Sequence, residues 1–174
     1  MDDLSHYSVI EHARGGSTLE IRALRPEDRV GLLAAVDQTS AQSLYRRFFG
    51  ARRRFTDKEI RFFLDVDFAS HVALVATAEH EGEHAIVGGA RYILTRPSQA
   101  EVAFTVIDAF QGQGIGGILM RHLIRIARLR GLTELAADVL SDNLRMLKLF
   151  EQCGLPLSKK READAIHVLL RLTS

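Results

Sequence analysis

A glycine-rich turn between an apolar strand pattern and an amphipathic helix pattern is the feature that most constrains this chain. Residues 112–117 read Gly-Gln-Gly-Ile-Gly-Gly, and a plain strand-to-helix turn seldom needs so many glycines. Glycine allows positive φ and lets a ligand approach the backbone closely. The unpaired N–H groups and positive dipole end of the following helix favour a phosphate. The sequence therefore predicts a loop that binds a phosphate or pyrophosphate.

A second phosphate-binding fingerprint fits the same residues. Gly112, Gly114 and Gly117 occupy the glycine positions of a dinucleotide-binding motif, and Asp138 follows at about the expected distance. However, residues 107–111 separate the loop from the preceding strand pattern, whereas the motif needs the strand to run into the first glycine. The chain after Asp138 is also too short for the second half of such a domain. A nicotinamide-binding domain is therefore the less favoured alternative.

Strand and helix patterns alternate along the rest of the chain. Alternation and short apolar runs predict strands at residues 18–24, 71–78, 84–93, 101–106, 134–139 and 165–172. Helical periodicity and capping signals predict helices at residues 26–38, 40–49, 56–65, 114–130 and 143–152. Short polar links between the early strands favour an antiparallel meander, and the later crossover through a helix favours one α/β domain.

Composition limits the classes of protein to which the chain can belong. With 174 residues, it is expected to form a polar arm at residues 1–17 and a single domain at residues 18–174. The net charge of +1 gives no global field for nucleic acid or a membrane surface, so neither partner is expected. A single cysteine, Cys153, excludes a disulfide framework and a multi-cysteine zinc site, and no metal is expected. No signal-peptide pattern or membrane-length apolar run occurs, so a cytoplasmic protein is the default expectation.

Residues around the glycines extend the motif. Gln111-x-x-Gly114-x-Gly116, after an apolar strand and before a helix, resembles the coenzyme A pyrophosphate loop of the GNAT acetyltransferase superfamily. Asn143 opens the next helix, and residues 150–155 (Phe-Glu-Gln-Cys-Gly-Leu) resemble that family's aromatic-x-x-x-Gly-aromatic ending. The resemblance implies an α/β (α+β) fold with a mixed sheet of six or seven strands and helices on both faces. The sheet would splay between its fourth and fifth strands to admit coenzyme A.

The resemblance also implies a donor substrate, acetyl-CoA, and the residues that contact it. The amides of residues 113–117 would hold the pyrophosphate, and the strand at residues 101–106 would pair through its main chain with the pantetheine arm. Asn143 would contact that arm from the side. The residues implied to contact the coenzyme are Phe104, Thr105, Val106, Gln111, Gly112, Gln113, Gly114, Ile115, Gly116, Gly117, Asn143 and Phe150.

Several segments resemble a narrower group, the catalytic domain of bacterial protein lysine acetyltransferases. They are Ser-Leu-Tyr-Arg-Arg-Phe-Phe at residues 43–49, Val-Asp-Phe at residues 66–68 with His-Val-Ala-Leu-Val at residues 71–75, and Glu-Val-Ala-Phe-Thr-Val at residues 101–106. This resemblance implies a catalytic glutamate at Glu101. A lysine amine, with a pKa of about 10.4, is protonated at neutral pH, so a general base is useful.

Two further features bear on the acceptor and on the leaving group. Tyr45, Arg47 and Phe49 belong to a basic and aromatic cluster that is a candidate for substrate binding or for a contact to the 3′-phosphate of the coenzyme. A solvated helix face with a basic turn is the equal alternative. Many GNAT enzymes carry a thiolate-protonating tyrosine at the position matched by Phe150, which has no proton to donate. The thiolate then leaves unassisted or is protonated by water or another group, unless the chain is catalytically weak.

The sequence thus favours an N-acetyltransferase that moves an acetyl group from acetyl-CoA to a primary amine, with Glu101 as base. A protein lysine is the preferred acceptor, and a small-molecule amine is the alternative. A non-catalytic acyl-CoA sensor is a second alternative, which the missing tyrosine favours and the glutamate opposes. The sequence leaves monomer and homodimer both open.

Overall fold

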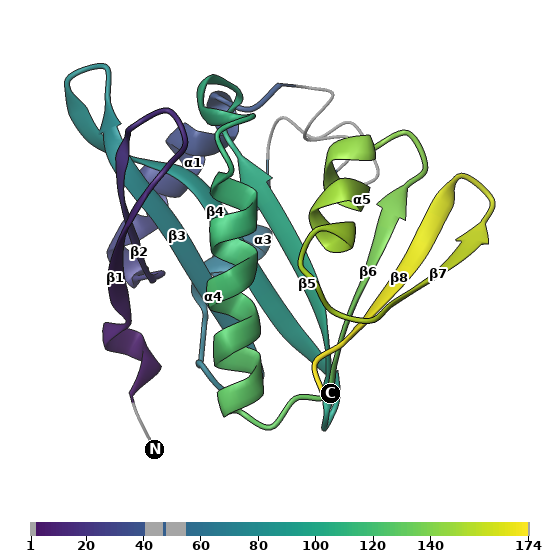
Figure 1. The fold of residues 1–174 in the computed structure, drawn as a ribbon. Helices are drawn as coiled ribbons and strands as arrows, with labels where there is room; N and C mark the ends of the chain where they lie inside the picture. The colour runs from purple at the N-terminus through teal and green to yellow at the C-terminus, as the bar shows by residue number, and fades with distance from the viewer. Residues whose placement is uncertain (1–2, 41–46, 48–54, 174) are drawn as a thin grey trace.

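Eight strands form one mixed sheet in the computed structural model, which describes residues 3–40, 47 and 55–173 (Figure 1). The strand order is β1-β2-β3-β4-β5-β6-β8-β7, and all neighbours are antiparallel except β5 and β6. The strands are β1 (Ser8–His12), β2 (Thr18–Ala23), β3 (His71–His80), β4 (Glu83–Arg96), β5 (Gln99–Val106), β6 (Glu134–Leu140), β7 (Leu157–Glu162) and β8 (Ala165–Arg171). The helices are α1 (Arg29–Asp37), α3 (Asp57–Leu64), α4 (Ile115–Leu129) and α5 (Leu144–Glu151), with short 3₁₀ turns η1 (Leu4–His6), η2 (Pro26–Asp28) and η3 (Asp108–Phe110).

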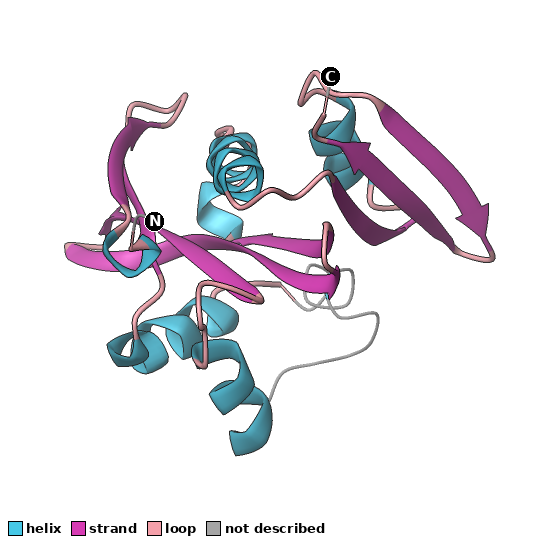
Figure 2. Ribbon diagram, turned by 90° about the horizontal axis from the view of Figure 1, so that it is seen from below, coloured by secondary structure: helices cyan, strands magenta, loops and turns pink. Residues whose placement is uncertain are grey.

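Helices cover both faces of the sheet, as the sequence predicted. Figure 2 shows α4 on one side of the first strands and α1 and α3 on the other. β3 is buried on both faces from His71 to Ala78, because helices lie above and below it. This explains why its sequence is continuously apolar rather than alternating.

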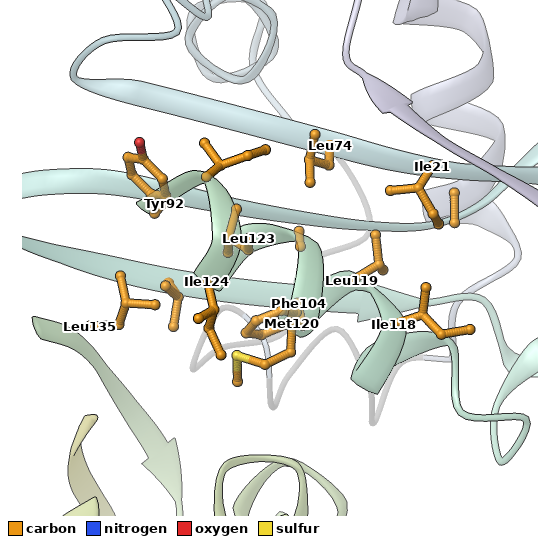
Figure 3. Packing of buried hydrophobic residues seen from close by; sticks show 14 of the residues in the cluster. Ile21, Leu74, Tyr92, Phe104, Ile118, Leu119, Met120, Leu123, Ile124 and Leu135 are labelled. Atoms are coloured by element: carbon orange, nitrogen blue, oxygen red, sulfur yellow. The ribbon is translucent and has the colours of Figure 1, made fainter. Parts of the chain in front are cut away.

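The larger core lies between α4 and the sheet (Figure 3). Leu119, Leu123 and Ile126 are fully buried on the inner face of α4, where they pack in one cluster with strand residues such as Leu74 and Phe104. The predicted apolar stripe of this helix is therefore confirmed. Its arginines, Arg121, Arg125 and Arg128, are exposed on the other face, as the amphipathic pattern requires.

The sheet opens between β5 and β6, the fourth and fifth of the strands that the sequence predicted. These strands pair only at Gln99–Glu134, Ala100–Leu135 and Glu101–Ala136. Beyond Glu101, residues 102–106 remain paired with β4 but have no register partner in β6, which continues on β8. The predicted splay is therefore confirmed, and the sheet contains a wedge whose vertex is at Glu101.

Two strands were missed, so the predicted count of six or seven is corrected to eight. β1 lies within the expected polar arm, and β7 carries the sequence Leu-Ser-Lys-Lys-Arg-Glu. Both are edge strands with mostly exposed side chains, and edge strands bear the charged residues that obscure a strand pattern. The predicted helix at residues 40–49 lies almost wholly outside the described residues.

A nearly buried ion pair connects β2 to the start of α1. Arg22 donates from both terminal nitrogens to the carboxylate of Asp28, each at 2.8 Å, and the Arg25 N–H donates to the same carboxylate at 2.7 Å. Burial acts to raise the pKa of Asp28, but these hydrogen bonds outweigh it and hold that pKa below its ordinary value. The contribution of Asp28 to stability is therefore full above its ordinary pKa and is lost as the pH falls through the lowered value.

Asp28→Ala is expected to lower the free energy of unfolding by about 3 kcal/mol, because it leaves the Arg22 guanidinium buried without its counter-ion. Urea denaturation at pH 7 measures this. Asp57→Ala is the matched control: its pair with Arg29 is exposed and 3.4 Å long, so the expected loss is below about 1 kcal/mol. Equal losses in the two variants would contradict this account of the pair.

Candidate functional site

The glycine loop leads from the wedge directly into α4. Gly112 and Gly114 have φ of +81° and +82°, a left-handed conformation in which a side chain would be strained. Gly114 is the N-cap residue of α4 and provides no side-chain hydrogen bond to it. The N–H groups of the first turn of α4 are thus left for another acceptor. This geometry fits the predicted anion-binding loop.

The loop is anchored to the sheet on the side of β5. A register shift in the β3–β4 ladder displaces Val87, whose carbonyl accepts a hydrogen bond from the Ile107 N–H at 2.9 Å. The side-chain amide of Gln111 donates to the Val106 carbonyl at 3.1 Å, and its oxygen accepts a hydrogen bond from Arg145 of α5. The side chain of Gln111 therefore joins β5, the loop and α5.

The other predicted coenzyme contacts differ in their accessibility. Asn143 caps α5, because its side-chain oxygen accepts the Met146 N–H at 3.3 Å. Phe150 is 1% exposed and packs edge-to-face against Phe104, with the ring centroids 6.3 Å apart. Both aromatic rings therefore belong to the core beside the wedge. Thr105 faces the opposite side of the sheet, where it lines a cavity.

Glu101 lies exposed at the vertex of the wedge. It is the last residue of β5 that pairs with β6, opposite Ala136, and it also pairs with Ile93 of β4. Alternation along β5 places its side chain on the same face as Ala103, toward α1 and α3, whereas Phe104 faces α4. A carboxylate is thus placed where the two halves of the sheet separate.

Two partly buried arginines lie on the Glu101 face. Arg47 and Arg91 both line a cavity of about 90 Å³ between the sheet and helices α1 and α3. Burial lowers the pKa of each to about 10, and the charge of Glu101 acts on Arg47 in the opposite direction. Arg47, a predicted substrate contact, is therefore close to Glu101, whereas Tyr45 and Phe49 lie outside the described residues.

Arg91 was missed by the sequence reasoning. Its guanidinium donates to the Phe63 carbonyl at 3.0 Å, lies 5.0 Å from the centre of the Phe63 ring, and is 2.9 Å from Nε2 of His71. Burial and the charge of Arg91 lower the pKa of His71 to about 4, so this ring is neutral at pH 7 and accepts the hydrogen bond. The signal in the sequence was a single charged residue inside an apolar strand pattern. His71 is thus a packed histidine.

A second, larger cleft runs along the outer side of α4 from the glycine loop. Its volume is about 830 Å³, and its lining includes Gly114, Gly117 and the end of α5. All the charged residues in this lining are arginines: Arg14, Arg121, Arg125 and Arg128. The cleft therefore suits an anionic ligand that extends from the loop. No group of His, Cys, Asp or Glu side chains in the described chain could hold a metal ion.

An open α/β sheet with a glycine loop at the head of the helix after the splayed strand defines a class of acyl-coenzyme A-dependent transferases. The sequence profile of the "Acetyltransferase (GNAT) family" matches residues 39–155. The chain belongs to this family.

Two relatives with similar sequences indicate which members of the family this chain resembles. The chain is 35% identical over 143 residues to "Acetyltransferase Pat" of Mycolicibacterium smegmatis, and the match covers 81% of this chain but 42% of that protein. It is 31% identical over 156 residues to "Acetyltransferase PA5475" of Pseudomonas aeruginosa, covering 89% and 83% of the two chains. The chain therefore spans less than half the length of Pat.

Solved structures agree with the sequence relatives. The GNAT domain of S. lividans PAT superposes with a TM-score of 0.86 at 31% identity, over 98% of this chain and 99% of that one. The fold is also shared with yncA of Salmonella typhimurium, solved "with its cofactor Acetyl-CoA", at a TM-score of 0.67 and 22% identity over 90% and 95% of the chains. The matched family is one of acetyltransferases, whose donor substrate is acetyl-CoA. None of the helices in the described part of the chain has the length and apolar character needed to cross a membrane.

The loop geometry predicts opposite effects for two glycine substitutions. Gly114→Ala is expected to lower the free energy of unfolding by about 1–2 kcal/mol, because φ is +82° and the new Cβ would lie 3.1 Å from Nε of Arg14. Gly117→Ala adds a Cβ in the first turn of α4 with nothing within 4 Å, so stability is expected to stay the same or rise by up to about 1 kcal/mol. Urea denaturation of both variants measures the contrast, and a Gly114→Ala variant as stable as wild type would contradict the assigned conformation.

Proposed function

We propose that the protein transfers the acetyl group of acetyl-CoA to a primary amine, preferably the side-chain amine of a protein lysine. The observation that carries the proposal is the wedge: it opens from Glu101 toward the glycine loop, so one end offers a carboxylate and the other uncapped amides. Acetyl-CoA supplies a thioester whose carbonyl carbon accepts a nucleophile.

The proposed coenzyme contacts are the backbone groups of the loop and of β5 that have no partner in the helix or the sheet. The amides at residues 113–117 provide donors for the diphosphate, and the absence of side chains at Gly116 and Gly117 keeps the approach open. The edge of β5 at residues 102–106 provides main-chain groups for the amides of the pantetheine arm. Phe104 and Phe150 would form an apolar wall beside that arm, and the capping of α5 by Asn143 would fix the opposite side.

Glu101 is the proposed general base. The amine nitrogen attacks the thioester carbonyl carbon, the carbon–sulfur bond breaks, and the proton lost by the amine passes to the Glu101 carboxylate directly or through water. Arg47 lies near enough for the two charges to interact, so we assign it a role in orienting the carboxylate or an acceptor. The roles assigned to Glu101 and Arg47 rest on the positions of these two side chains at the wedge and on their opposite charges.

Phe150 cannot protonate the leaving thiolate, because its ring carries no acidic proton. The ring is instead buried against Phe104. Cys153 does not replace it, since its thiol donates to the Phe150 carbonyl at 3.0 Å within the same helix end. Protonation by water, or departure as the thiolate, is the proposal that agrees with these contacts.

A protein lysine is preferred as acceptor because residues 43–49 and 101–106 resemble protein lysine acetyltransferases, and because Pat and S. lividans PAT match this chain. The exposure of Glu101 at the vertex of the wedge agrees with an acceptor that approaches from solvent. A lysine on the surface of another protein can reach such a base with its long side chain.

Glu101→Gln is expected to lower kcat for acetylation of a mixed lysine-peptide library by about 10²- to 10⁴-fold while the Kd for acetyl-CoA stays unchanged. The deficit should shrink as the pH approaches the lysine pKa of about 10.4, because the amine then loses its proton without a base. Mass spectrometry of the peptides and calorimetric titration with acetyl-CoA measure the two quantities.

Glu134→Gln is the matched control, since Glu134 begins β6 and pairs with Gln99 in the closed part of the sheet, two residues before the vertex. It should leave kcat within about twofold of wild type. Full activity of Glu101→Gln would contradict the assigned base, and a wild-type protein that binds acetyl-CoA but acetylates no peptide would support the non-catalytic acyl-CoA sensor instead.

A further inference from the structure

The turn between β1 and β2 lies directly against the glycine loop. The Arg14 N–H donates to the Gln113 carbonyl at 3.1 Å, which joins two segments that lie about one hundred residues apart in the sequence. The contact is close, because a Cβ on Gly15 would lie 3.1 Å from the side-chain oxygen of Gln113. The turn between β1 and β2 therefore packs directly against the glycine loop.

A polar cluster holds the hairpin against α4. Nδ1 of His122 bonds the Tyr7 hydroxyl, and its Nε2 lies 2.8 Å from the Glu11 carboxylate. Arg121 donates to the same carboxylate at 2.9 Å. Burial acts to raise the pKa of Glu11, but the hydrogen bonds from His122 and Arg121 outweigh it and keep that pKa below its ordinary value. Glu11 is therefore a carboxylate at neutral pH, and it fixes β1 to the helix that carries the loop.

This arrangement places the guanidinium of Arg14 beside Gly114. Nε of Arg14 is 3.1 Å, and Nη2 is 3.4 Å, from the position that a Cβ on Gly114 would occupy. Arg14 also lines the cleft that continues from the loop. Its side chain is exposed, and it forms no ion pair with any residue that the structure describes. Arg121, by contrast, is paired with Glu11.

The loop itself has no formal positive charge to offer a phosphate. Residues 107–120 contain no lysine or arginine, and their only charged residue is Asp108. Helix N–H groups supply partial charges, whereas a diphosphate carries full negative charges. A cation for such a group must come from another segment, and Arg14 is the guanidinium beside the N-cap residue of α4.

We propose that Arg14 is a coenzyme-binding residue that contacts the diphosphate of acetyl-CoA, so that the β1–β2 hairpin completes the donor site. This assignment rests on the proposed use of acetyl-CoA. A planar guanidinium fits phosphate oxygens by paired hydrogen bonds, which an amide or an ammonium reproduces only in part. The hairpin thus has a functional role in addition to extending the sheet.

Calorimetric titration of the whole chain with acetyl-CoA and with 3′-dephospho-acetyl-CoA tests the assignment. Arg14→Gln is expected to raise both Kd values by the same factor, about 10- to 30-fold, because the diphosphate is common to the two ligands. The loss should shrink in 1 M salt, since an exposed charge interaction is screened there. Arg14→Lys should give an intermediate Kd.

Two controls separate binding from folding. Arg14→Gln keeps the backbone hydrogen bond to Gln113, so the melting temperature without ligand should match that of wild type. Arg171→Gln removes an exposed arginine from the end of β8, and it should leave both Kd values unchanged.

Equal binding by wild type and Arg14→Gln would overturn the assignment. A loss with acetyl-CoA that is absent with the 3′-dephospho form would also overturn it, because the contact would then be to the 3′-phosphate. No binding of acetyl-CoA by wild type would contradict the proposed function and the Arg14 assignment together, which distinguishes that failure from the other two.

Discussion

The separation of β5 from β6 is the constraint on which the rest of the structure depends. Parallel pairing lasts for three residues and ends at Glu101, after which β5 stays with β4 while β6 stays with β8. The separation leaves one edge of a central strand without a strand partner, which is costly unless another group bonds it. Aromatic packing between Phe104 and Phe150 fills the interior beside the opening and keeps the two halves in one core.

The two ends of the wedge have different proposed roles: the open end binds the coenzyme, and the closed end provides the general base. At the open end, the displaced Val87 carbonyl and the side chain of Gln111 set the path of the chain from β5 into the glycine loop. At the closed end, Glu101 faces the side of α1 and α3, where Arg47 and Arg91 are partly buried. The donor and the acceptor would therefore approach the vertex from opposite faces of the sheet, which would bring the amine and the thioester together there.

Local patterns predicted most of this fold. The glycine loop and the helices α3 and α4 are set by neighbours in the sequence, and all are confirmed. A capping box at Thr56 begins α3, and Gly131 (φ +78°) follows the end of α4. The edge strands β1 and β7 were missed because neither contains a fully buried residue, so no clear apolar alternation marks them in the sequence. The roles of Arg14 at the loop and of Arg91 at the cavity were missed as well. Each arginine contacts residues that are distant in the sequence, so no local pattern indicates its position. Sequence thus predicted the scaffold and the loop, while the charges around them required the tertiary structure.

Hydrogen–deuterium exchange with and without saturating acetyl-CoA tests the central claim most directly, because it reports on the loop and the wedge together. The account predicts slower exchange at the backbone amides of residues 113–117 and along the unpaired edge of β5, residues 102–106, with α1 and α3 unchanged. These are the groups that the fold leaves without strand or capping partners. Acetyl-CoA binding that protects α1 and α3 while the loop and β5 exchange as before would contradict it.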